Sequence, residues 1–139
     1  MGRPRGFDEE AVTREAVALF SGRAYDGLSV DDLVTGLGVH RNSLYKTFGS
    51  KRGLYLTALR WYLRNELEPL LVAGATTEGL RTSDKLDLLL LAAAEQAPLD
   101  GEVGALVGGA LRRLDDVLGP DAANLLLGLR LRARIDTGE

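Results

Sequence analysis

The sequence predicts an all-α fold, with an N-terminal three-helix helix-turn-helix domain and a short helical C-terminal dimerisation domain. Three observations support this. Apolar residues recur at helical spacing, capping residues and glycines bound those runs, and no stretch shows the alternation typical of a strand. We expect residues 1–7 to form a flexible basic arm, residues 8–52 the helix-turn-helix domain, and residues 53–139 a connecting helix and the dimerisation helices.

Composition restricts the functions open to this chain of 139 residues. It has no cysteine and a single histidine, His40, so it lacks a disulfide framework, thiolate chemistry and the residues of a typical Cys/His zinc site. The adjacent carboxylates Asp115 and Asp116 diverge by about 100° on a helix, which does not suit paired acid–base work. We expect no enzymatic activity, no cofactor and no metal.

No targeting or membrane segment is predicted. Arg3 and Arg5 are not followed by the apolar run of a signal peptide, and the apolar residues 86–94 cover only about half of a membrane span. We therefore expect a cytoplasmic protein that does not enter a membrane.

The first helix is expected from a cap at Asp8 to about Ser21. Its buried stripe should consist of four apolar residues at helical spacing, Val12, Ala16, Leu19 and Phe20.

Residues 28–54 show the spacing of a helix-turn-helix. Ser29 can cap a helix whose first turn holds Asp31 and Asp32, where carboxylates favour the positive end of the macrodipole. Its apolar face consists of Val30, Leu33, Val34 and Leu37. Gly36 and Gly38 flank its end, and glycine there supplies the left-handed backbone that stops a helix. A second helix is expected at residues 41–47.

The second helix has two distinct faces. Leu44 and Phe48 point one way, while Asn42 and Lys46 point nearly opposite, with Ser43 and Tyr45 on the flanks. Amide, ammonium, hydroxyl and phenol are groups that bond base edges and phosphates. The alternative is an ordinary solvated polar face.

The next helix begins with an unusual placement of charge. Ser50 can cap it, yet Lys51 and Arg52 occupy its first turn, where positive side chains oppose the macrodipole. A phosphate held there by the free backbone N–H groups and the lysine would account for this placement.

The distribution of charge along the chain also favours a phosphate partner for the N-terminal part. The net charge is −3, but residues 1–67 carry ten Lys and Arg against eight Asp and Glu, whereas residues 68–139 carry seven against twelve. Positive charge is concentrated around the helix-turn-helix, which favours a nucleic-acid partner for that part.

Residues from about 7 to 62 resemble the DNA-binding domain of the tetracycline-repressor (TetR) family. The resemblance rests on the order and spacing of Ala16-Val17-Ala18-Leu19-Phe20, Tyr25-Asp26-Gly27-Leu28-Ser29-Val30, Leu33, Gly38-Val39, Leu44-Tyr45, Phe48 and Ser50-Lys51. It implies that Ser29, Tyr45 and Lys51 contact phosphates. It also implies that four residues reach bases or adjacent phosphates: Arg41, Asn42, Ser43 and Lys46.

The chain departs from the family pattern at the recognition helix. His40 stands where the family usually has a capping serine, and Arg41-Asn42-Ser43 replaces the common Lys-Gly-Thr. Before the first helix, Arg3 and Arg5 resemble the Arg-Pro core of minor-groove hooks, with a disordered terminus as the alternative.

A longer helix is expected from Gly53, with Pro69 marking its bend or end. Trp61 and Tyr62 either line a ligand cavity or pack the DNA-binding domain against the C-terminal part of the chain, and we favour packing. A looser linker, residues 73–83, precedes three helices at about 84–96, 100–118 and 120–135.

The last two helices are the predicted dimer interface. Its residues are Leu106, Ala110, Leu114, Leu125, Leu126 and Leu129, in helices whose glycines at 104, 108, 109 and 128 suit close backbone approach. The alternative is an intramolecular core. In the family, two such helices from each subunit form a four-helix bundle, and a two-fold dimer places two recognition helices about one DNA turn apart.

The resemblance implies a homodimeric, sequence-specific transcriptional regulator, usually a repressor, that binds a pseudo-palindromic operator through the major groove and joins the nucleoid when bound. Family members usually devote a hundred or more residues to the C-terminal domain, and about seventy follow Pro69 here. Because no aromatic residue, His, Met or Cys follows Tyr62, any effector should be small and aliphatic, and effector-free binding is the other possibility. The alternative function is a helical protein-interaction adaptor.

Overall fold

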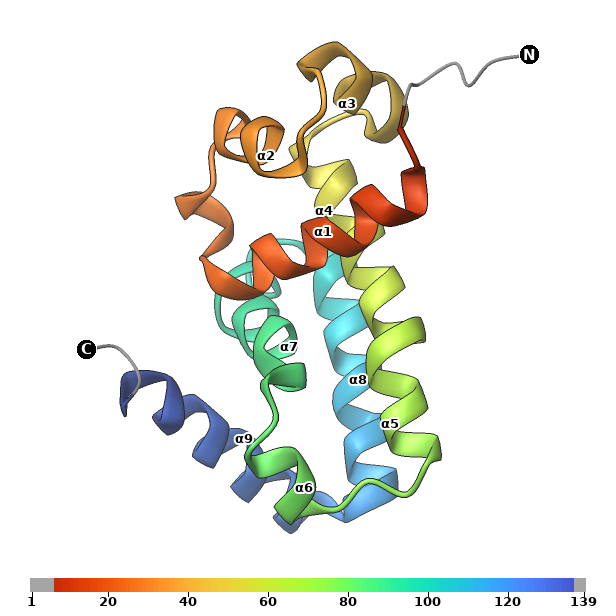
Figure 1. The fold of residues 1–139 in the computed structure, drawn as a ribbon. Helices are drawn as coiled ribbons and strands as arrows, with labels where there is room; N and C mark the ends of the chain where they lie inside the picture. The colour runs from red at the N-terminus through yellow and green to blue at the C-terminus, as the bar shows by residue number, and fades with distance from the viewer. Residues whose placement is uncertain (1–6, 137–139) are drawn as a thin grey trace. The chain divides into compact units, whose positions relative to one another are not determined.

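The computed structural model describes residues 7–136, and every regular element within them is helical (Figure 1). In chain order the elements are α1 (Glu9–Gly22), the 3₁₀ turn η1 (Tyr25–Gly27), α2 (Val30–Leu37), α3 (Arg41–Phe48), α4 (Lys51–Tyr62), the π turn η2 (Leu63–Leu67), α5 (Glu68–Val72), α6 (Thr77–Arg81), the 3₁₀ turn η3 (Asp84–Leu86), α7 (Asp87–Leu91), the π turn η4 (Ala92–Gln96), α8 (Gly101–Leu118) and α9 (Pro120–Asp136). The all-α prediction is confirmed.

The chain divides into two compact units, Met1–Tyr62 and Leu63–Glu139. The first holds α1 to α4, and the second holds η2 to α9. The predicted helix-turn-helix domain, residues 8–52, lies wholly within the first unit, which continues through α4 to Tyr62.

The N-terminal unit buries one face of α1 against α4 and α2. The predicted stripe of α1 is confirmed at Val12, Ala16 and Phe20, which are almost fully buried. Leu19 is only half-buried; it lies at the contact with α2, where a Cβ placed on Gly36 would come within 3.0 Å of its Cδ1. This close approach explains a glycine inside a helix as short as α2.

An aromatic cluster joins α1, η1 and α4. The Tyr55 ring meets the rings of Phe20 and Tyr25 edge to face, with centroid distances of 5.0 and 4.9 Å. Further along α4, Tyr62 is buried and the guanidinium of Arg14 lies 5.7 Å from the ring centroid of Trp61. Trp61 thus contacts α1 of the same unit, and the predicted packing of these two aromatic residues against the C-terminal part of the chain stays a prediction.

Pro69 changes the type of helix without ending it. The π turn η2 lies directly before α5, and Pro69 is in the first turn of α5, the part of a helix that tolerates proline best. Helical backbone continues to Val72, so of the two expected alternatives, a bend or an end at Pro69, the helix does not end there.

The expected linker at residues 73–83 contains a helix. Thr76 caps α6 by accepting a hydrogen bond from the backbone N–H of Gly79 at 3.1 Å, and Leu80 is buried. A helix of five residues that includes a glycine is too short to show helical periodicity in the sequence.

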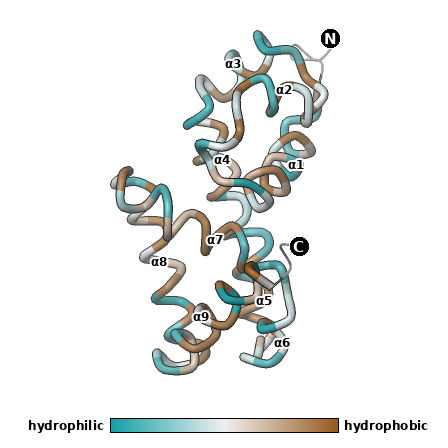
Figure 2. The backbone as a smooth tube through the Cα atoms, turned by 90° about the vertical axis from the view of Figure 1, so that its left-hand side faces the viewer, coloured by the Kyte–Doolittle hydropathy of each residue, from teal (hydrophilic) through white to brown (hydrophobic). Residues whose placement is uncertain are grey.

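The remaining helices follow the predicted bounds. Residues 84–96 form one helical run divided into η3, α7 and η4, and Asp100 caps α8 with its carboxylate at 3.0 Å from the backbone N of Glu102. Figure 2 shows long hydrophobic stretches along α8 and α9, which pack against each other.

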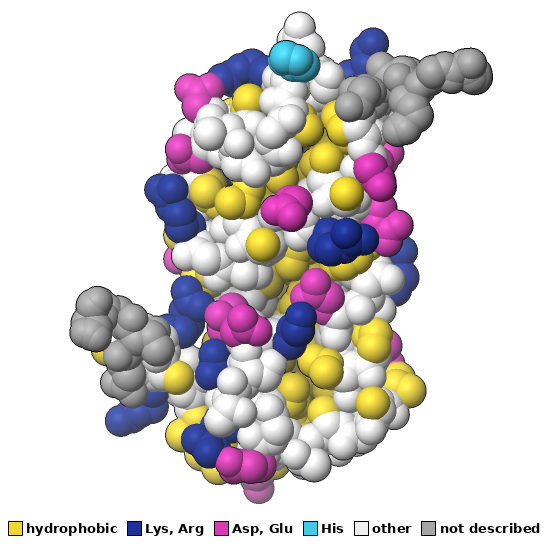
Figure 3. All heavy atoms as spheres, in the orientation of Figure 1, with side chains coloured by type: hydrophobic (Ala, Val, Ile, Leu, Met, Phe, Trp, Pro, Cys, Tyr) yellow, Lys and Arg dark blue, Asp and Glu magenta, His cyan; other side chains and the backbone are white. Residues whose placement is uncertain are grey.

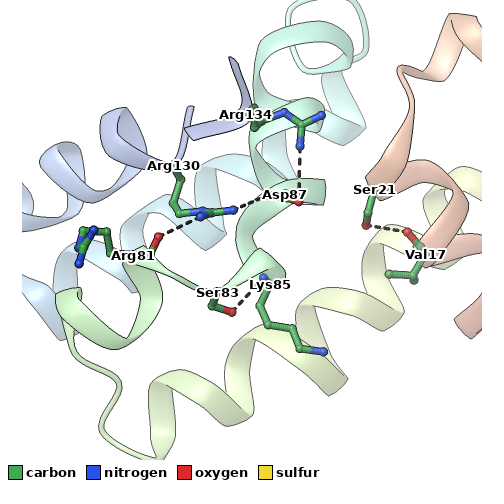
Figure 4. Close-up of polar contacts among 8 residues, drawn as sticks. All are labelled: Val17, Ser21, Arg81, Ser83, Lys85, Asp87, Arg130 and Arg134. Carbon is green, nitrogen blue, oxygen red and sulfur yellow. Dashed lines mark hydrogen bonds and ion pairs between the residues drawn. The ribbon is translucent and has the colours of Figure 1, made fainter. Parts of the chain in front are cut away.

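Charged side chains tie α9 to its neighbours in the C-terminal unit. Arg130 donates to the carbonyl of Arg81 at 2.9 Å and to the Asp87 carboxylate at 3.3 Å, and Arg134 lies 3.5 Å from the second oxygen of Asp87 (Figure 4). The side chains of Arg130 and Asp87 are largely buried, so losing one partner would leave a poorly solvated charge.

Candidate nucleic-acid interface

The start of α2 is fixed by a capping box. The backbone N–H of Asp32 donates to Ser29 Oγ at 3.0 Å, and the backbone N–H of Ser29 donates to the Asp32 carboxylate at 2.9 Å. The Ser29 backbone bond, followed by the Ser29 hydroxyl, lowers the pKa of Asp32 below its ordinary value. Ser29 therefore holds the first helix of the motif in addition to its predicted role at a phosphate.

The turn between α2 and α3 depends on a left-handed glycine. Gly38 has φ of +68°, and its N–H donates to the carbonyl of Val34 at 3.0 Å, which closes α2. Extended backbone at His40 then begins α3, and the imidazole makes no capping hydrogen bond to the described backbone of that helix. His40 therefore does not take over the capping role of the serine that the family usually has at this position.

The faces of α3 are those that the sequence predicts. Leu44 is fully buried and Phe48 is half-buried, so these side chains anchor the helix. The polar side chains from Arg41 to Lys46 lie on the exposed part of α3, where Arg41, Asn42, Tyr45 and Lys46 are exposed and Ser43 is half-exposed. The structure thus brings five predicted contact residues together on one short helix.

Arg41 has an acidic partner on the neighbouring helix. Its Nη2 donates to Oδ1 of Asp31, in the first turn of α2. Nothing in the sequence spacing indicates this pair, because the two residues lie on different helices and meet only through the geometry of the turn between them.

The start of α4 brings Lys51 back to Tyr25, the first residue of η1. Ser50 accepts a hydrogen bond from the backbone N–H of Gly53 at 3.0 Å and so acts as the predicted cap. The Lys51 ammonium donates to the carbonyl of Tyr25 at 2.6 Å and lies 4.1 Å from the centroid of that ring. An ammonium carries three donors, so this anchoring is compatible with a phosphate contact.

Gly53 has a structural role that the sequence pattern does not show. A Cβ at this position would lie 1.9 Å from the carbonyl oxygen of Phe48, the last residue of α3. Only glycine allows α3 and α4 to approach this closely without a backbone shift. A glycine inside the first turn of a helix is the one local signal that could have indicated it.

Basic and acidic side chains are mixed on the surface of the unit. Figure 3 shows Lys and Arg side chains next to Asp and Glu side chains at the end that α2 and α3 form. Arg3 and Arg5, the predicted minor-groove contacts, lie outside the described residues.

The predicted dimer face needs correction. Ala110, Leu114 and Leu126 are buried within the C-terminal unit, where α8 and α9 pack against each other and against neighbouring helices, so these three belong to the chain's own core. Leu106 and Leu129 are half-exposed. The predicted Leu125 is exposed (60%), and two further apolar residues on α9 are exposed as well, namely Leu131 (54%) and Ile135 (77%).

A shallow apolar groove lies between η2–α5 and α8. Its volume is about 220 Å³, and its lining is Leu63, Leu67, Glu68, Leu71, Leu106, Gly109, Ala110 and Arg113. Arg113 spans it with a bidentate pair to Glu68, at 3.0 Å from Nε and 2.6 Å from Nη2. The hydrogen bond from Arg113 lowers the pKa of Glu68.

The N-terminal unit is thus a helix-turn-helix DNA-binding module with an anchored second helix and a polar outward face. Residues 12–58 match the family model of bacterial regulatory proteins of the tetR family. Together with the similarity to a Bacillus subtilis regulator along most of the chain, this match shows that the chain belongs to the TetR family. It is a DNA-binding transcriptional regulator and not an enzyme.

Three relatives are similar to this chain. The Bacillus subtilis protein, the uncharacterized HTH-type transcriptional regulator YezE, is 32% identical over 133 residues, a match that covers 84% of this chain and 69% of that protein. The HTH-type transcriptional repressor BdcR of Escherichia coli is 41% identical over 69 residues, covering 50% of this chain and 35% of BdcR. The repressor ComR of the same organism is 37% identical over 62 residues, covering 45% and 30%.

The last two matches span about a third of each relative's own length. No solved structure matches the chain. None of the helices in the described residues 7–136 is both long enough and apolar enough to cross a membrane.

Proposed function

We propose that this regulator is a homodimeric repressor that binds a pseudo-palindromic operator, with α3 of each subunit in the major groove. The observation that carries the proposal is α3 itself, anchored by Leu44 and exposing a guanidinium, an amide, a phenol and an ammonium. A protein-interaction adaptor, the alternative, would be expected to have a neutral face there.

The contacts divide into two groups. Arg41 is assigned to guanine O6 and N7, and Asn42 to adenine N6 and N7, with Ser43 and Lys46 at neighbouring bases or phosphates. Ser29, Tyr45 and Lys51 are assigned to phosphates, which fix the position of α3 without reading sequence. Arg3 and Arg5 are assigned to the minor groove beside the operator half-site.

Dimerisation is assigned to the exposed apolar face of the last helix. Leu125, Leu131 and Ile135 leave more apolar surface on one helix than scattered exposure explains, and Leu129 on the same helix is half-exposed. Leu106, on α8, is half-exposed and remains a candidate for the same interface. A two-fold dimer through this face would present two copies of α3 to successive major grooves.

Any effector would be small and aliphatic. The groove of about 220 Å³ between α5 and α8 has leucine walls and one charged pair, Glu68 with Arg113, and it offers no aromatic ring for stacking. Operator binding without an effector is the second form of the proposal. In either form the protein acts in the cytoplasm and joins the nucleoid when it binds DNA.

The names of the Escherichia coli relatives, both HTH-type transcriptional repressors, support repression as the outcome of binding. The proposal is tested by selecting fragments of the organism's own genome that the purified full chain retains, and by footprinting the enriched site. A protected two-fold symmetric site that overlaps a promoter is the expected result. Retention of fragments without a common sequence would contradict operator-specific repression.

A further inference from the structure

The ion pair between Arg41 and Asp31 joins the first turns of α3 and α2, which lie next to each other in the N-terminal unit (Figure 1). Asp31 is 80% exposed and the Arg41 side chain is about half-exposed, at 47%. An ion pair this open to water contributes little to the stability of the fold. A structural role is therefore a weak explanation for the pair.

Capping does not explain Asp31 either. The capping box of α2 is completed by Ser29 and Asp32, and Asp32 also faces Arg23 at 3.8 Å. A second carboxylate in the first turn adds to the favourable interaction with the macrodipole, but that interaction does not require it to reach α3. Beside a DNA phosphate backbone, a carboxylate opposes binding.

We propose that Asp31 is a positioning residue that sets the sequence specificity of Arg41. This inference rests on the proposed function, in which Arg41 reads a base. A guanidinium has five N–H donors, and the pair uses Nη2, so other donors stay able to meet guanine O6 and N7. Holding the side chain before binding removes part of the entropy cost of ordering it in the groove.

The pair also penalises incorrect sequences. A free arginine facing a base that it cannot bond would turn to a phosphate and recover binding energy at any site. Asp31 restrains that movement and offsets the charge of Arg41, so it lowers affinity for unrelated DNA. Both effects increase the difference in binding affinity between DNA with the preferred base and DNA with another base at that position.

The test uses the full chain and a pool of DNA duplexes with a randomised stretch, followed by titration of the selected duplex and its single-base variants. The proteins are wild type, Asp31→Asn, Asp31→Glu, Arg41→Ala and the double variant Asp31→Asn with Arg41→Ala. Asp26→Asn is the matched control, since Asp26 is an exposed acid of the same unit that precedes α2. Thermal unfolding verifies that every variant is folded.

Asp31→Asn should reduce the preference at the Arg41 position by about 2- to 10-fold. It should also tighten binding to an unselected duplex and increase the magnitude of its salt slope by up to about one, because Arg41 is then released to phosphates. Asp31→Glu should restore part of the preference. In the Arg41→Ala background, Asp31→Asn should leave the base preference unchanged, and Asp26→Asn should alter no single position.

Two outcomes would overturn the inference. If Arg41→Ala abolishes one preference per half-site and Asp31→Asn leaves that preference intact, the proposed function stands and the role of Asp31 fails. If Arg41→Ala changes no preference, or if the wild type selects no sequence, the assignment of Arg41 fails and the inference on Asp31 fails with it.

Discussion

The two units of this chain differ in what holds their helices. In the N-terminal unit, the starts of α1, α2 and α4 are capped by side chains within three residues, at Asp8, Ser29 and Ser50, whereas α3 has no such cap at His40. The C-terminal unit also has local caps, but its helices are joined by ion pairs between distant residues. Glu68 and Arg113 are 45 positions apart, and Asp87 and Arg130 are 43 apart.

This difference separates two kinds of information in a sequence. Caps and glycines fix where a helix begins and ends, and they act over a few residues. Which face of a helix meets which neighbour depends on contacts across the fold, as the helices of the C-terminal unit show. A DNA-reading module needs fixed helix ends, because its contacts depend on the placement of one short helix.

The largest expected effect concerns the exposed face of α9. Leu125→Asp places a charge in the proposed dimer interface without a partner, which should weaken association by roughly several kcal/mol and separate the subunits. Operator affinity should fall far more than loss of one contact explains, since each half-site then binds alone. Sedimentation and DNA titration measure both.

The matched control is Leu99→Asp. Leu99 is 78% exposed and lies outside α8 and α9, so the same substitution there should leave the oligomeric state unchanged. A Leu125→Asp protein that is still dimeric and still binds tightly would mean that the subunits meet elsewhere.

The next largest effect is expected from a substitution that disrupts the packing between α3 and α4. Gly53→Ala puts a Cβ against the Phe48 carbonyl and should lower the free energy of unfolding by about 1–3 kcal/mol or more. Gly22→Ala is the control, because its Cβ would meet no described atom within 4 Å, and it should change stability by less than about 1 kcal/mol. Urea unfolding followed by circular dichroism compares the two. Equal stabilities would disprove the close approach.

A smaller effect is expected at Lys51. If its ammonium contacts a phosphate, Lys51→Ala should weaken binding to all sequences alike and reduce the magnitude of the salt slope by about one. Lys85→Ala, which removes the same charge from the C-terminal unit, should leave the slope unchanged. A Lys51→Ala protein with wild-type affinity and slope would remove Lys51 from the interface.

The smallest effect concerns the cap of α2. Ser29→Ala should cost about 1 kcal/mol of stability. Because folding lowers the pKa of Asp32, its carboxylate stabilises the fold above the ordinary value of 3.8, and this contribution is lost as the pH falls through the lowered value. The stability difference between wild type and Asp32→Asn should therefore be larger at about pH 7 than at about pH 3. An equal difference at both pH values would argue against the capping box.

The same contrast explains how much the sequence alone could predict. The starts of α1, α2, α4 and α8 follow from local caps, and the exposed face of α3 follows from helical periodicity. The role of Gly53 and the pairing of Arg41 with Asp31 could not be predicted in this way, because each depends on how two helices meet in space.

The C-terminal unit shows the limit most clearly. Periodicity identifies an apolar face on α8, but it does not say whether the same chain or a partner covers that face. The structure places Ala110 and Leu114 inside the unit. On α9, leucines surround the helix, so one face is buried through Leu126 while another is exposed at Leu125.

The central claim is that two copies of α3 read the major groove of one operator. Interference by methylation of guanine N7, a major-groove atom, tests it on the site enriched from the genome. We expect two groups of interfering guanines centred about 10 base pairs apart, or a multiple of that distance. We also expect that methylation of one guanine in each group no longer affects binding of the Arg41→Ala protein. A single group, or a pattern that Arg41→Ala leaves unchanged, would contradict the claim.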